Sequence, residues 1–203
     1  MASDRSLDTR IRRLSQAIAE GDGISILVHV ADAEMARAGE ADGAEGLALT
    51  SAVPGVREAT TLPILFRAPG PDQARAAAAD AWSLRVEDAG EDEELLARSY
   101  ANALDLGLEC VVAVRDDEEL ELALERLDPE IFLLSPRDAE DDEVPLERIL
   151  DLLPDVPAGK LAIAELETTT REEVLALERA GVDAVLVRRG FVAELVGRQP
   201  PEV

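Results

Sequence analysis

Short apolar runs alternate along the chain with longer segments whose apolar residues recur at helical spacing. Each run is too short for a helix and long enough for a buried strand. Because a helix-length segment separates consecutive runs, the strands should pair in parallel. The runs predict strands over residues 24–30, 47–51, 62–67, 81–86, 110–114, 131–134, 161–165 and 184–187.

The intervening segments predict one helix between each pair of strands. They cover residues 32–43, a short helix through 56–57, and residues 71–79, 92–106, 118–127, 146–153 and 168–181, with a final helix over 191–196. This repeat of strand and helix, at roughly 20 to 25 residues, predicts a compact (β/α)8 TIM barrel. A doubly wound open sheet is the alternative, but it calls for a Gly-rich phosphate loop after the first strand, and residues 31–43 contain none.

One domain is expected over residues 1–203, with residues 23–197 as the barrel and 198–203 as a tail. Residues 1–22 form an N-terminal extension, in which apolar residues recur at helical spacing over residues 6–20. Because this helix precedes every strand, we expect it to plug or flank the sheet.

The clearest strand–helix–strand unit spans residues 160–190. Thr170 and Glu173 have the spacing of a capping box, and Gly181 closes the helix before the strand AVLV. In parallel α/β folds, ligands bind at the carboxyl ends of the strands. Those ends are here Glu165 and the Arg188-Arg189 pair, so this unit marks the expected site.

Composition narrows the function classes. The chain has 44 acidic against 20 basic residues, a formal net charge of −24. This charge disfavours partners such as nucleic acid and anionic membranes. The basic residues are arginines except for Lys160, a bias that fits either a salt-loving source or GC-rich codons.

Aromatic residues make up only 2% of the chain, so the core must consist of Ala, Val, Leu and Ile. The single cysteine, Cys110, is interpreted as a buried strand residue. No apolar stretch reaches the ~18 residues of a membrane span, and the first ten residues lack a signal-peptide core. We therefore expect a cytoplasmic protein.

Several segments resemble one family. They are LPILFRAP for a third strand, GLECVVAVRDDEELELAL for a fifth strand and helix, SPRD for the turn after strand six, KLAIAELET for a seventh strand and AGVDAVLV for an eighth. From Leu62 to Gly190 the chain thus resembles indole-3-glycerol phosphate synthase, the barrel enzyme of tryptophan biosynthesis that decarboxylates and cyclises a carboxyphenylamino-deoxyribulose phosphate. The resemblance implies a carbon–carbon lyase without a cofactor.

The residues that the resemblance places in the active site mostly differ. Where the family has a catalytic Lys on strand three and a Glu on strand five, this chain has Arg67 and Ala113. The family's Asn after strand six is Ser135, and His29 corresponds to a Lys near the end of strand one. Glu165 alone stands where the family has its strand-seven Glu. Arginine keeps the positive charge but is too basic to deliver a proton near neutrality.

The phosphate-binding segments differ as well. The family's Ser-Gly-Ile after strand seven is Leu166-Glu167-Thr168, and its Gly-Ser after strand eight is Arg188-Arg189. These changes predict that the synthase reaction is lost and that the barrel at most binds an anion. The alternatives are an active divergent synthase and a structural barrel with no small-molecule site.

Glu165 and His29 are the candidate catalytic residues, as a general base and a proton carrier. Each also has a structural interpretation. Glu165 would form a buried ion pair with Arg188, and His29 would be a packed, hydrogen-bonded residue. The acidic run at 138–143 has no spacing that selects a cation, so we expect a solvated loop and no metal site.

Arginines gather at the predicted strand ends, namely Arg67, Arg85, Arg115, Arg137, Arg188 and Arg189. Four of these arginines form the candidate site for a small anionic or phosphate ligand, together with two threonines at the start of the predicted helix over residues 168–181. The members of this site are Arg67, Arg85, Arg188, Arg189, Thr168 and Thr169. The alternative is a ring of salt bridges to nearby carboxylates, namely Glu87, Asp88, Asp116, Asp117 and Asp138.

Overall fold

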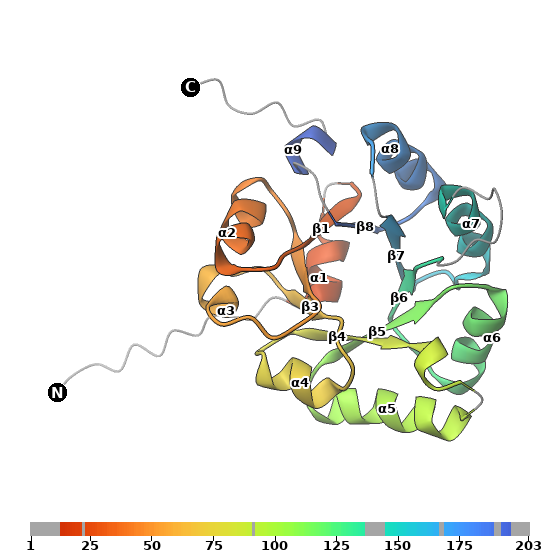
Figure 1. Cartoon of the computed structure of the whole chain (residues 1–203). Coiled ribbons are helices and arrows are strands. Elements are labelled where there is room, and N and C mark those ends of the chain that lie inside the picture. Colours follow the sequence, from red (N-terminus) through yellow and green to blue (C-terminus); the bar gives the residue numbers. More distant parts are fainter. Residues whose placement is uncertain are drawn as a thin grey trace, which may run out of the picture.

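The computed structural model describes residues 13–21, 23–90, 92–136, 145–166, 169–188 and 192–195. Within them, eight strands close into a barrel in the order β1 to β8, and every neighbouring pair is parallel (Figure 1). The strands are β1 (Ser25–His29), β2 (Gly46–Leu49), β3 (Ile64–Phe66), β4 (Ala81–Arg85), β5 (Glu109–Val114), β6 (Ile131–Leu134), β7 (Leu161–Leu166) and β8 (Ala184–Val187). The predicted TIM barrel is confirmed, and the closed β1–β8 pairing excludes the open sheet.

Helices surround the barrel in the predicted alternation (Figure 1). They are α2 (Ala33–Ala41), α3 (Val56–Ala59), α4 (Pro71–Ala76), α5 (Glu93–Asp105), α6 (Asp117–Arg126), α7 (Pro145–Leu152), α8 (Arg171–Ala180) and α9 (Val192–Leu195), with 3-10 turns η1 (Val86–Asp88) and η2 (Leu153–Asp155). Among the described residues, no helix is both long and apolar enough to cross a membrane.

The strands have two buried faces, which is why they appear in the sequence as continuous apolar runs. The outer face packs against the helices and carries the larger side chains, such as Phe66, Trp82 and Phe132. The inner face fills the lumen with Leu65, Val111 and other aliphatic or small side chains. Few aromatic residues are needed for a core built this way.

A short helix, α1 (Leu14–Ala19), plugs the end of the barrel where the strands begin. Figure 1 shows α1 inside the ring of strands, and Leu14 and Ile18 belong to the lumen core. Glu109, the first residue of β5, accepts a hydrogen bond from the Leu14 N–H at 2.5 Å and another from the Ser15 hydroxyl. The predicted helix over 6–20 is therefore a plug, although its residues 6–12 lie outside the described part of the chain. Polar side chains gather at the opposite end, the mouth of the barrel.

Candidate functional site

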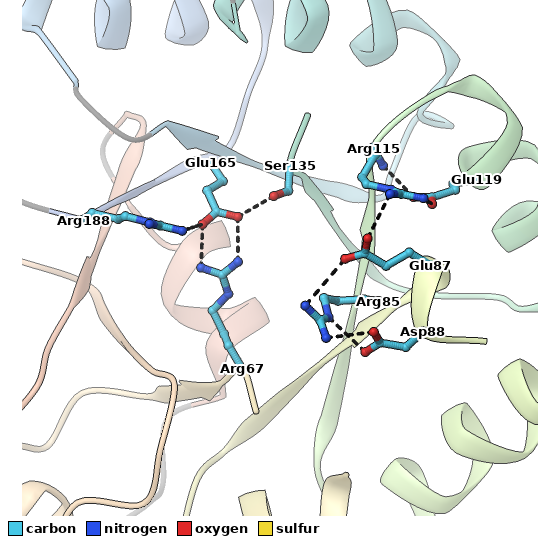
Figure 2. A network of polar contacts seen from close by, with 9 residues as sticks. All are labelled: Arg67, Arg85, Glu87, Asp88, Arg115, Glu119, Ser135, Glu165 and Arg188. Atoms are coloured by element: carbon cyan, nitrogen blue, oxygen red, sulfur yellow. Dashed lines mark hydrogen bonds and ion pairs between the residues drawn. The ribbon is translucent and has the colours of Figure 1, made fainter. Parts of the chain in front are cut away.

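Glu165 lies at the mouth and is held by Arg67 from the far side of the lumen (Figure 2). Ile163, two residues earlier on β7, is part of the lumen core, so alternation turns Glu165 inward. Arg67 directly follows β3, and its N–H extends the β2–β3 pairing by donating to the Leu49 carbonyl at 2.7 Å. Two guanidinium N–H groups donate to the two Glu165 oxygens, each at 2.6 Å. Both side chains are only 6% exposed, which makes this a buried bidentate pair.

Two further side chains contact the Glu165 carboxylate (Figure 2). The Ser135 hydroxyl, just beyond β6, donates to Oε2 at 2.5 Å. Arg188, just beyond β8, places Nη2 at 3.9 Å from Oε1, and its side chain is 47% exposed. The predicted Glu165–Arg188 pair is thus the longer of two ion pairs. Arg67 is the tighter partner, because strand alternation identifies the face of a side chain but not its neighbour across a barrel.

His29 ends β1 beside this group and is half-buried. Burial lowers the pKa of His29, the charges of Arg67 and Arg188 lower it further, and Glu165 partly offsets them. His29 is therefore neutral at pH 7. Two guanidinium groups, those of Arg67 and Arg188, thus meet at the Glu165 carboxylate in this half of the mouth. We call Arg67, Ser135, Glu165, Arg188 and His29 the Glu165 cluster.

A second polar cluster lies over β4 and β5 (Figure 2). Arg85 donates to both Asp88 oxygens, at 2.9 and 2.8 Å. Glu87 lies between two arginines, 3.6 Å from Nη1 of Arg85 and 2.9 Å from Nη1 of Arg115. Arg115 also contacts Glu119. Two arginines meet three carboxylates, so these residues form the salt-bridge network that was the alternative to anion binding.

Glu119 is a member of this network that the sequence analysis missed. Its signal was the four-residue spacing from Arg115, which places the two side chains together at the start of α6. Asp116, predicted as a salt-bridge partner, instead caps α6 by accepting from the Glu119 N–H at 2.9 Å. The first turn of a helix has unpaired N–H groups, and a preceding aspartate satisfies one of them.

Between the two clusters lies a cavity of about 10 Å³, lined among others by Arg85, Ala113 and Ser135. A space of this size holds about one water molecule. Ala113, on β5, thus leaves a small void where the family resemblance implied a glutamate.

The start of α8 is built as predicted, since Thr170 and Glu173 form a capping box. Thr169 lies directly before this cap, and within the described residues its buried hydroxyl has no hydrogen-bond partner. The other residues predicted here and at the β8 end, Thr168 and Arg189, lie outside the described residues, as do Glu167, Arg137 and Asp138.

Cys110 is buried on β5, which confirms its interpretation as a strand residue. Burial raises the pKa of its thiol to about 12. The thiolate is the nucleophilic form of cysteine, so Cys110 has no nucleophile to offer at neutral pH.

A comparison with protein families adds a finding that the geometry alone does not give. Residues 71–194, more than half of the chain, match the family described as indole-3-glycerol phosphate synthase. The chain belongs to the indole-3-glycerol phosphate synthase family. The matched range runs from the start of α4 into α9 and so includes Ala113, Ser135, Glu165 and Arg188. It begins after Arg67 and His29, whose correspondence to family positions rests on the sequence resemblance.

Solved structures support the fold of this synthase-family chain. N-acetylmannosamine-6-phosphate 2-epimerase from Clostridium perfringens has a TM-score of 0.66 at 16% identity, covering 81% of this chain and 86% of the epimerase. Thiamine phosphate pyrophosphorylase from Pyrococcus furiosus has a TM-score of 0.61 at 18% identity, covering 85% of this chain and 90% of the pyrophosphorylase. The aldolase QR15 has a TM-score of 0.66 at 14% identity, covering 86% of this chain and 95% of the aldolase. At these identities the likeness concerns the barrel fold, not the chemistry.

Proposed function

We propose that this synthase-family barrel does not catalyse indole ring closure and binds a small phosphate-like anion at the mouth, beside β1, β3, β7 and β8. One observation carries both parts of the proposal. Two arginines, Arg67 and Arg188, share the single carboxylate of Glu165. The arrangement offers no acid near neutrality, and it brings two guanidinium groups together at the mouth.

The loss of ring closure follows from the side chains at the expected catalytic positions. Arginine is too basic to release a proton near neutrality, and both terminal nitrogens of Arg67 donate to Glu165, so Arg67 cannot serve as the acid. Ala113 supplies no carboxylate. The Ser135 hydroxyl, in place of the family's amide, donates to Glu165 rather than facing a substrate.

Anion binding is supported by charge and by position. The two guanidinium groups lie in a chain of net charge −24, so they attract an anion locally within a repulsive surface. Arg188 is half exposed, so an anion in solution can reach it. The Thr169 hydroxyl and the N-terminus of α8 add a hydrogen-bond donor and a favourable helix dipole beyond the end of β7.

Inorganic phosphate at constant ionic strength tests the proposal by thermal shift. At ~10 to 100 times its dissociation constant, phosphate should stabilise the wild type by ~1 to 3 kcal/mol. Arg188→Ala should lose this stabilisation, whereas Arg85→Ala, which removes an arginine from the salt-bridge network, should keep it. An absent shift, or the same shift in Arg188→Ala, would favour the structural barrel.

An active divergent synthase is the second candidate, favoured by the family match and by Glu165 at the end of β7. A turnover assay with the family's substrate separates the two proposals. We expect no indole-glycerol phosphate above a no-enzyme control. Arg67→Lys combined with Ala113→Glu should not restore turnover, because the segments that bind phosphate in the family, after strands seven and eight, also differ in this chain.

A further inference from the structure

We propose that Glu165 is an internal competitor for the anion site: in the ligand-free protein its carboxylate occupies the Arg67 guanidinium, and an incoming anion displaces it toward Arg188. This inference rests on the anion site proposed above and adds how that site is regulated. Its consequence is that the protein binds anions more weakly than its arginines alone would allow.

The contact between Arg67 and Glu165 has the geometry of a bound anion. The two N–H···O bonds measure 2.6 Å each. Their side-by-side arrangement (Figure 2) is the one by which arginine recognises carboxylate and phosphate ligands. A phosphate that binds Arg67 end-on, as Glu165 does, needs the same two donors. Because both side chains are 6% exposed, no second anion fits beside Glu165 on that edge of the guanidinium.

The structure also offers the displaced carboxylate a second position. Oε1 of Glu165 already lies 3.9 Å from Nη2 of Arg188, whose side chain reaches the surface. A rotation of the Glu165 side chain toward Arg188 would keep the carboxylate next to a cation. Displacement therefore costs at least the bidentate contact and the Ser135 hydrogen bond, but keeps the carboxylate next to a guanidinium.

Removing the charge of Glu165 should reveal the intrinsic affinity of Arg67. When a site is open in only a fraction of molecules, the apparent affinity falls by that fraction. A glutamine keeps the shape of the side chain but does not hold a guanidinium as a carboxylate does. Glu165→Gln should therefore bind inorganic phosphate at least about tenfold more tightly than the wild type.

Glu87→Gln is the matched control. It removes the same charge from the same mouth, from a carboxylate that lies between Arg85 and Arg115 and does not contact Arg67. If only the net charge mattered, both variants would gain equally. We expect Glu87→Gln to change phosphate affinity by less than about threefold, because charges in solvent are screened by salt.

Two more variants test the competitor in case Glu165→Gln does not fold properly. Ser135→Ala keeps every charge and loosens Glu165 by one hydrogen bond, so it should tighten phosphate binding about two- to fivefold. Arg67→Ala added to Glu165→Gln should abolish the gain. Circular dichroism of each variant checks that the barrel is folded.

Calorimetric titration with inorganic phosphate at fixed ionic strength gives distinct outcomes. Tighter binding by Glu165→Gln that depends on Arg67 and exceeds that of Glu87→Gln supports the competitor. Wild-type binding that depends on Arg188 but is unchanged in Glu165→Gln and Ser135→Ala overturns the competitor and leaves the anion site standing. No binding by folded wild type, Glu165→Gln or Ser135→Ala overturns the anion site, and the competitor with it.

Discussion

Removing Arg67 alone would leave Glu165, which is 6% exposed, without its bidentate partner. Truncating one member of a buried ion pair typically costs ~3 to 5 kcal/mol, and Arg188 at 3.9 Å places this case near the lower end. We expect Arg67→Ala to lower the free energy of unfolding in urea by about 3 kcal/mol. Replacing both residues, as Arg67→Met with Glu165→Leu, should cost far less, because no charge is then left buried.

Arg85→Ala is the control for this comparison. Arg85 also has carboxylate partners, but its side chain is 32% exposed, and pairs near the surface contribute ~0 to 1 kcal/mol. Equal losses in Arg67→Ala and Arg85→Ala would contradict the view that burial makes the Glu165 pair different. A large loss in the double replacement would show that the pair itself stabilises the barrel.

The sequence predicted which residues reach the mouth but not how they combine there. Alternation along single strands placed Arg67, Glu165 and Arg188 toward the lumen, because the direction of a side chain is a local property. Their pairing depends on how strands that are distant in the sequence meet across the closed barrel. Arg67 and Glu165 are 98 positions apart, and no local pattern links them.

At the level of elements, the sequence predicted the ends of a helix or strand correctly where a capping residue or a buried apolar run marks the boundary. β6 and β8 match their predicted ranges, and the Thr170–Glu173 capping box begins α8 as expected. β2 was predicted two residues too far, since Thr50 and Ser51 are exposed and lie beyond the last β2–β3 pair, Leu49 with Phe66. Strand length depends on the neighbouring strand, which a linear pattern does not contain.

The end of α4 offers a test at this scale. Ala78 follows the helix with φ of 52°, in the left-handed region that favours glycine. The Ala78 N–H donates to the Arg75 carbonyl, and the Ala79 N–H donates to the Ala74 carbonyl. Together these two hydrogen bonds form a Schellman motif. We expect Ala78→Gly to raise the free energy of unfolding by about 0.5 to 1 kcal/mol, measured by urea denaturation.

Gly107 provides the reverse substitution. It ends α5 in the same motif with φ of 76°, and a Cβ built there meets no atom within 4 Å. Gly107→Ala therefore tests backbone strain without a steric clash, and should destabilise by about 1 kcal/mol. If Ala78→Gly leaves the free energy of unfolding unchanged while Gly107→Ala lowers it, the strain at Ala78 is relieved elsewhere in the loop before β4.

For the molecule as a whole, topology was the most predictable feature. The alternation of apolar runs and amphipathic segments requires parallel pairing, and eight such units close the sheet. The role of the first helix was not decided by its pattern. Its apolar face suits a plug or a flanking helix equally, and the contacts of Leu14 with the lumen core and of its N–H with Glu109 decide for the plug.

Charge is the other property of the whole chain, and it predicts a response to salt. With 44 acidic and 20 basic residues, most carboxylates have no arginine to meet, and they repel one another over the surface. The screening length falls from ~10 Å at 0.1 M to ~3 Å at 1 M salt. Salt also weakens exposed ion pairs, but those contribute little at the surface. The melting temperature should therefore rise between 0.1 and 1 M KCl, and each ~1 kcal/mol gained corresponds to ~2 to 4 °C.

A variant of α6 separates repulsion from other effects of KCl. Glu118, Glu121 and Glu125 are exposed on this helix, and changing all three to Gln removes three charges without touching the core. This variant should melt higher than the wild type at 0.1 M KCl and gain less from added salt, because it has less repulsion to screen. Equal salt gains in both proteins would assign the effect to water exclusion from the surface rather than to charge. A melting temperature that is flat or falls with salt would remove the electrostatic argument and leave codon usage as the explanation of the arginine bias.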